Sequence, residues 1–236
     1  MRLHFFGQPR LAPAPGARAL LAPPTKPVAL LAVVALTDAG DPVSRDAAAS
    51  LIWPRLHKGA RSGRLRQLLA LTRRTFGAEV FEGAGPNHVG LARDRVWCDA
   101  WRLAQAFEEG AYEEATMLYR GPVLQGWDGS SGAEWEEWRE AKDASLRRLA
   151  GEAAWRASRE ARDNGETRRA IELARRAVSL DPDNERGVRE LMRLLQASGD
   201  RAGALAEYER LARRMRSAWG ASPAPETTAM IAPPPA

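Results

Sequence analysis

The chain has few of the residues on which disulfide frameworks, metal sites and membrane spans are built. Its single cysteine, Cys98, excludes an internal disulfide, and its three histidines lie far apart, at no metal-ligand spacing. The longest purely apolar run, residues 28–36, is too short to span a bilayer and does not open the chain as a signal peptide would. We therefore expect a cytoplasmic protein that has no membrane segment and binds no metal or cofactor.

Signatures of catalysis are equally scarce. The stretch GAGPNHVG lacks the Lys-Ser/Thr that follows a phosphate-binding loop, and it precedes a strand pattern instead of opening a helix. Carboxylates gather in residues 134–143, but Trp135 and Trp138 share a helix face there, which favours a solvated helix with a packed aromatic stripe over an acid/base site. The setting RVWCDAW favours a buried apolar Cys98 over a reactive thiol. We predict no catalytic residue and no enzymatic activity.

Acidic residues are scarce in the first part of the chain. Residues 1–95 hold 14 Lys and Arg and 6 Asp and Glu, a net +8, whereas residues 96–236 hold 21 and 24, a net −3. The basic character is therefore confined to the front. This segregation predicts that the first part meets a polyanion and that the second part has another task.

The order of elements at the front is typical of a winged helix-turn-helix. Short strands broken by prolines and glycines come first, and a helix that is apolar almost all round, and so buried, follows them. Ser44 is predicted to cap a second helix that Pro54 ends, and a third helix covers GARSGRLRQLLALTRRTFG, residues 59–77. The segments AEVFE and HVGLA, on either side of GAGPN, then form a hairpin, the wing. We assign residues 1–97 to this DNA-binding domain.

Helices alone are predicted from residue 101 onward. WRLAQAFEEG and AYEEATMLYRG come first, a long helix over residues 133–163 follows, and two helix pairs come after it. The fold class is therefore mainly α, with a short sheet and a wing hairpin at the front.

The last helix pairs repeat one another. GETRRAIELARRAVSL, from Gly165, realigns with GDRAGALAEYERLARRM, from Gly199, at an offset of 34 residues. This is the period of tetratricopeptide helix hairpins, and DPDNE supplies the turn between one hairpin and the next. We assign residues 98–222 to an all-α, tetratricopeptide-like domain that contacts partners, and residues 223–236 to an extended, Pro-rich tail.

The third helix has two chemically different faces. Apolar residues and one threonine line the inward face: Leu65, Leu68, Leu69, Thr72 and Phe76. The outward face carries Gly63, Arg66, Gln67, Ala70, Arg73 and Arg74, with Arg64 and Leu71 on one flank. Arginine and glutamine can make paired hydrogen bonds to guanine and adenine, and small residues allow close approach to the bases.

Further cations lie around this helix. Lys58 and Arg61 precede it, and Arg93 and Arg95 follow the wing, where all four suit contacts with phosphate groups. An arginine-rich helix face is also the ordinary solvated side of a core helix. Taken alone, the third helix leaves both interpretations open.

The motifs resemble one known family when they are taken in order. LIWP, LRQLL, TRRTFG, VGLARDRVWCDAWRL, LYRGPVLQGW, EWEEWREAKDASLRRLA, GDRAGALAEYERLARRM and SPAPET occur along the chain. Together they are similar to the antibiotic regulatory protein (SARP) type of activator, a winged helix-turn-helix followed by a bacterial transcriptional activator domain. The resemblance extends from residue 1 to about residue 228.

The resemblance implies a function and partners. The family implies sequence-specific binding to double-stranded DNA near promoters, often at direct repeats, and activation by contact with RNA polymerase. Its helical domain implies a surface for a partner or a homodimer. The ATPase and sensor segments of larger family members do not follow here, so ATP-driven control is not expected.

The third helix departs from the family pattern at three residues. Ala70, Leu71 and Thr72 stand where Ser-Arg-Leu is usual, so an arginine on the groove side is lost. Thr72 also places a hydroxyl at a core position, where it needs a backbone partner. The change predicts either an altered or weaker site preference or a helix that no longer reads DNA.

We therefore predict a DNA-binding transcriptional regulator, an activator, whose third helix enters the groove. Arg66, Gln67 and Arg74 are predicted to face the bases or the groove wall. Backbone charge is predicted to come from Lys58, Arg61, Arg64 and Arg73, with Ala70 and Leu71 also at the interface. The alternative is a tetratricopeptide-like interaction module whose winged-helix domain no longer reads DNA specifically.

Overall fold

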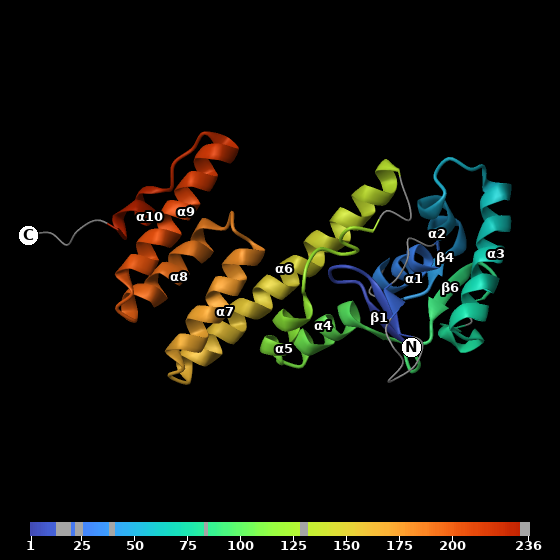
Figure 1. The fold of residues 1–236 in the computed structure, drawn as a ribbon, viewed down its shortest axis with the longest axis horizontal. Helices are drawn as coiled ribbons and strands as arrows, with labels where there is room; N and C mark the ends of the chain where they lie inside the picture. Colours follow the sequence, from blue (N-terminus) through green and yellow to red (C-terminus); the bar gives the residue numbers. More distant parts are fainter. Residues whose placement is uncertain (13–19, 22–25, 38–40, 83–84, 128–131, 232–236) are drawn as a thin grey trace, which may run out of the picture. The chain divides into compact units, whose positions relative to one another are not determined.

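Two compact units make up the structure, a computed structural model that describes residues 1–12, 20–21, 26–37, 41–82, 85–127 and 132–231. The first unit comprises Met1–Glu109 and Met117–Arg147, and the second comprises Gly110–Thr116 and Arg148–Ala236. In the described residues, strands occur at the front of the chain and helices alone behind it (Figure 1). The predicted mainly α fold class is confirmed.

A four-stranded sheet joins the two ends of the front segment. Its strands are β1 (Arg2–His4), β2 (Arg10–Ala12), β3 (Leu20–Leu21) and β7 (Trp97–Cys98), in the order β3-β2-β1-β7. β1 runs antiparallel to β2 and parallel to β7, so the chain returns to its first strand after the wing. The two-residue β7 spans the predicted domain boundary at residues 97 and 98, which stays a prediction.

Three helices and a small sheet form the helix-turn-helix and its wing. The helices are α1 (Lys26–Leu36), α2 (Arg45–Ile52) and α3 (Lys58–Phe76). The wing sheet has the order β4-β6-β5, from β4 (Val43–Ser44), β6 (His88–Leu91) and β5 (Phe81–Glu82), and the short 3-10 helix η2 (Ala78–Val80) precedes β5. The predicted order of strands, three helices and hairpin is confirmed.

Local sequence accounts for the ends and burial of these helices. Residues Val28–Leu36 of α1 are all buried, as its uniformly apolar sequence predicts. The Ser44 side chain accepts a hydrogen bond from the Ala47 amide at 3.5 Å and so caps α2 as predicted. Part of the predicted strand region and the first two residues of the wing turn, residues 13–19, 22–25 and 83–84, lie outside the described residues.

Three helices precede the repeats and a fourth begins them. They are α4 (Asp99–Glu108), α5 (Tyr112–Leu118), α6 (Ala133–Asp163) and α7 (Thr167–Leu180). The long α6 begins and ends where the sequence places it, and it contributes to both units. Trp135 is fully buried and its ring centroid lies 5.0 Å from that of Trp138, which confirms the packed aromatic stripe.

Helix repeats with a constant offset build the second unit. After α7 come α8 (Glu185–Ala197) and α9 (Arg201–Trp219), and α9 begins 34 residues after α7. Gly165 and Gly199 both have positive φ, at 81° and 87°, where glycine is favoured. Ala170 and Ala204 are both buried, so the predicted small-residue positions are packing positions.

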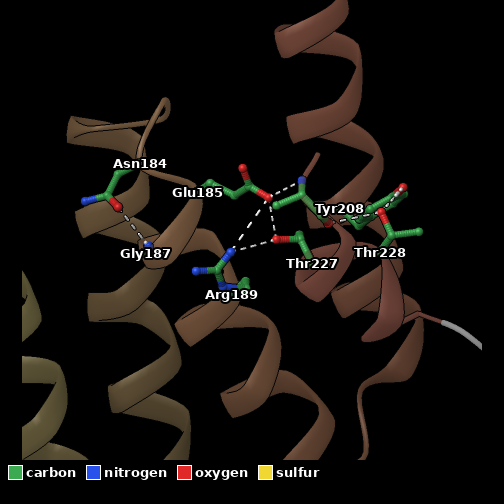
Figure 2. Close-up of polar contacts among 8 residues, drawn as sticks. Asn184, Glu185, Gly187, Arg189, Tyr208, Thr227 and Thr228 are labelled. Carbon is green, nitrogen blue, oxygen red and sulfur yellow. Dashed lines mark hydrogen bonds and ion pairs between the residues drawn. The ribbon is translucent and has the colours of Figure 1, made fainter. Parts of the chain in front are cut away.

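The end of the described chain is more ordered than its composition suggests. Residues Pro225–Ala229 form the short helix α10, so the expectation of an extended tail is wrong there. Glu185 accepts hydrogen bonds from the Ala224 amide and the Thr227 hydroxyl, and Arg189 also donates to Thr227 (Figure 2). Met230 and Ile231 pack on the core of α8 and α9. These tertiary contacts outweigh the local preference of a Pro-rich segment.

The described residues hold neither a membrane-spanning helix nor a metal-binding cluster. Among these residues no helix is long and apolar enough to cross a membrane. Within the same residues no group of three or more His, Cys, Asp or Glu side chains could hold a metal ion.

Candidate nucleic-acid interface

Helix α3 is held in place by its capping residues and its inward face. His57 Nδ1 accepts a hydrogen bond from the Ala60 amide at the start of the helix, at 3.4 Å, and Gly77, with φ of 104°, ends it. The predicted inward residues Leu65, Leu68, Leu69 and Thr72 are all buried. One face of α3 is therefore fixed against the core.

Thr72 has the backbone partner that a buried hydroxyl needs. Its side chain is fully buried, and Oγ1 donates a hydrogen bond to the Leu68 carbonyl at 2.8 Å. The departure from the family pattern at this position is therefore accommodated inside the core.

The opposite face of α3 is open to solvent. The predicted contact residues that are exposed are Lys58, Arg64, Arg66, Gln67, Ala70, Leu71, Arg73 and Arg74. Six Lys and Arg residues and no Asp or Glu occur along the helix. Within the part of the chain that the structure describes, Arg66, Gln67 and Arg74 take no hydrogen bond or ion pair, so their donors are available to a ligand.

Arg61 is the predicted contact residue that is only half exposed. Its guanidinium donates hydrogen bonds to the Leu56 carbonyl, to Ser50 Oγ and, at 3.1 Å, to the Pro54 carbonyl. Ser50 lies on α2 and Pro54 in the turn, so Arg61 joins α2, the turn and α3. The phosphate contact predicted for Arg61 stays a prediction, beside this structural role.

Three other predicted cations have partners on neighbouring elements. Lys58 Nζ lies 3.5 Å from Asp46 of α2, and the Arg73 guanidinium lies 5.5 Å from the ring centroid of Phe81 in the wing. Arg93 lies 3.7 Å from Asp41 and 5.2 Å from the ring centroid of Trp101. Exposed pairs of this kind are weak, so they orient these side chains without removing their charge from a ligand.

Two cations near the turn were missed by the sequence analysis. Lys26, at the start of α1, and Arg55, in the turn, line a recess together with Arg64 of α3. Arg55 directly follows Pro54, which was predicted to end the second helix, and this place in the turn was the available signal. Lys26 had no comparable signal, because only the fold brings the start of α1 to the turn.

The carboxyl group whose pKa is most strongly shifted belongs to Asp99, which lies on α4 and not on the open face of α3. Asp99 is 3% exposed and accepts hydrogen bonds from the amides of Phe5, Phe6 and Ala100. Burial raises the pKa of Asp99 to about 6, although these amides act in the opposite direction. Burial also raises the pKa of the Cys98 thiol, and the side chain is buried as predicted. Asp99 therefore joins the segment after β1 to the start of α4.

Comparisons with known proteins identify a family for the rear of the chain and a similar fold for nearly all of it. A family model described as bacterial transcriptional activator domain matches residues 91–232, more than half of the chain. A search of curated proteins found no match.

One solved structure provides a comparison along nearly the whole chain. The fold is similar to that of Mycobacterium tuberculosis EmbR in complex with a low-affinity phosphopeptide, with a TM-score of 0.66 and 18% sequence identity. The similarity covers 98% of this chain and 63% of that chain, so this chain spans less than two thirds of the EmbR chain. At this identity the likeness shows the fold.

Proposed function

The chain belongs to the bacterial transcriptional activator domain family and is SARP-like, and on that premise we propose that it regulates transcription by sequence-specific binding to double-stranded DNA. The observation that carries the proposal is the open face of α3. Arg66, Gln67 and Arg74 lie there without partners among the described residues, on a helix whose other face is buried.

The side chains of α3 suit separate tasks in a DNA groove. Arg66, Gln67 and Arg74 would read base edges by paired hydrogen bonds. Lys58, Arg61, Arg64 and Arg73 would position the helix through phosphates, which carry no sequence information. Ala70 allows close approach to the bases, and Leu71, 43% exposed, lies on the flank of the same face without a charge for a phosphate.

The helical part supports a role beyond binding DNA. We propose that residues 98–222 contact RNA polymerase, or a second copy of the chain in a homodimer, and that the regulator is an activator without enzymatic activity. Repeats of helix hairpins expose extended surfaces for protein partners, and α7, α8 and α9 form such repeats. The boundaries at residues 97 and 222 are part of this proposal.

Arg66→Ala tests the reading of bases. The full chain is first used to select duplexes from random DNA, and affinities for a selected and a shuffled duplex are then measured at several salt concentrations. We expect Arg66→Ala to lower affinity for the selected duplex about tenfold or more and to change the shuffled duplex much less. Arg193→Ala is the matched control, because Arg193 is exposed on α8 and should leave both affinities unchanged.

The alternative function gives a different result in the same measurement. If the winged-helix domain no longer reads DNA, no sequence is enriched and affinity falls steeply as salt rises, as counterion release requires. Equal losses on both duplexes with Arg66→Ala would assign that residue to phosphate alone.

A further inference from the structure

A recess beside the helix-turn-helix gathers positive charge from three elements. It has a volume of about 290 Å³ and lies where the end of α2 and the turn meet α1 and α3. The residues that line it are Lys26, Ile52, Trp53, Pro54, Arg55, Leu56 and Arg64. None of these described lining residues is acidic, so the recess combines three cations with an apolar wall.

The cations of the recess come from parts of the sequence that only the fold brings together. Arg55 and Arg64 are exposed, and neither takes a hydrogen bond or ion pair with the described residues. Partial burial lowers the pKa of Lys26, which means that its charge is partly removed from water. Like charges held together in this way repel one another, and an anion between them relieves the repulsion.

The recess adjoins the open face of α3 at Arg64. Arg64, Gln67 and Leu71 are spaced at intervals of three and four residues, so they share one side of the helix. All three are exposed. We infer a docking in which the groove lies against Gln67 and Leu71 and one strand of its sugar-phosphate backbone crosses α3 at Arg64, beside the recess.

We propose that this recess holds one phosphate group of the DNA backbone, flanking the bases that α3 reads, with Arg55 and Arg64 as its main ligands. Guanidinium groups suit this role because their planar donors match two phosphate oxygens at once. The inference rests on the proposed function, and it adds Arg55 and Lys26 to the residues that meet DNA. Arg55 fixes register along the duplex and reads no base.

Neutralising single phosphates identifies the partner of Arg55. Each phosphate of a bound duplex is replaced in turn by an uncharged methylphosphonate, and affinity is measured for the wild type and for Arg55→Gln. We expect one position, or two adjacent ones, where neutralisation weakens the wild type about tenfold and weakens Arg55→Gln much less. The proposal would be overturned if, at every position, the free-energy losses from neutralisation and from Arg55→Gln simply added. Arg193→Gln is the matched control and should show the full wild-type pattern.

Salt dependence and sequence preference give a second measure. Arg55→Gln should make the slope of log affinity against log salt shallower by about 0.9 on both a selected and a shuffled duplex. The sequences selected from random DNA should stay unchanged. A changed sequence preference with an unchanged slope would contradict a phosphate role. Arg55 is exposed, so melting temperatures should match and exclude misfolding as the cause.

Inorganic phosphate separates the two sources of the same chemistry. Without DNA, the indole N–H resonance of Trp53 is followed during titration with phosphate at constant ionic strength. A weak shift that added DNA removes agrees with a backbone phosphate. A tight, saturable shift that DNA leaves in place would assign the recess to a free phosphate compound and overturn the proposal.

Failure of this inference differs from failure of the proposed function. If the wild type enriches no sequence, the proposed function fails, yet the smaller salt dependence of Arg55→Gln can still be measured on a shuffled duplex. If a sequence is enriched and Arg55 couples to no phosphate, the recess inference alone fails.

Discussion

At the scale of single residues, a side chain's place around α3 decides its role. Thr72 and Leu71 are adjacent, yet Thr72 is fully buried and Leu71 is 43% exposed. The departures from the family pattern therefore act separately. The hydroxyl of Thr72 is satisfied within the helix. The loss of an arginine at Leu71 bears on the contact face alone.

Replacing Leu71 should strengthen DNA binding. Leu71→Arg adds a cation at an exposed position without disturbing the core, so we expect tighter binding to both selected and shuffled duplexes. The slope of log affinity against log salt should steepen by about 0.9 for one new phosphate contact. Fluorescence anisotropy titrations at several salt concentrations measure both quantities. An unchanged slope would mean that residue 71 does not approach the backbone.

Asp99 should give the stability of the fold a distinct pH dependence. Its pKa is raised to about 6 from 3.8, so the folded chain binds more protons than the unfolded chain between these values. The stabilisation is complete below about pH 4 and is lost as pH rises through about 6, by about 3 kcal/mol. Urea unfolding of the wild type and Asp99→Asn at both ends of this window measures the difference. Wild-type stability that rises with pH relative to Asp99→Asn would show that the three amide hydrogen bonds outweigh burial.

At the scale of elements, the sequence predicts what depends on local periodicity and end signals. Helices α2 and α3 fall where Ser44, Pro54 and Gly77 delimit them. Strands β4 and β7, of two residues each, were not predicted, because their existence depends on pairing with distant strands β6 and β1. The sequence predicted a phosphate contact for Arg61. Its structural role was missed, because its hydrogen-bond partners across the turn become its neighbours only in the fold.

Arg61 should stabilise the turn between α2 and α3. Arg61→Ala removes three hydrogen bonds from a charged group to Ser50, Pro54 and Leu56, and we expect a loss of about 2 kcal/mol in the free energy of unfolding. Lys58→Ala is the control, since its exposed pair with Asp46 should be worth less than about 0.5 kcal/mol. Equal effects in chemical denaturation would contradict the structural role of Arg61.

At the scale of the whole molecule, the sequence predicted the types of domain and the helix repeat but not the order at the end of the described chain. The 34-residue repeat was visible because small residues recur at the packing positions Ala170 and Ala204. Helix α10 was missed because its Pro-rich composition indicates an extended chain. Its order comes from Glu185 and Arg189 of α8, which no local pattern connects to Thr227.

The contacts of Glu185 should decide whether α10 stays docked in the second unit. Glu185→Ala leaves the Ala224 amide and the Thr227 hydroxyl without their acceptor, and we expect a loss of about 2 kcal/mol. Faster amide hydrogen exchange over residues 225–231 should accompany it. Glu226→Ala is the control, because Glu226 is exposed in the first turn of α10. Unchanged exchange in Glu185→Ala would mean that Met230 and Ile231 hold α10 by packing alone.

Selection from random double-stranded DNA by the full chain tests the central claim most directly. We predict that one sequence is enriched and that its preference holds as salt is raised, while Arg66→Ala loses preference at one position within it. Recovery of no sequence, with binding that disappears steeply as salt rises, would contradict the claim that α3 reads DNA.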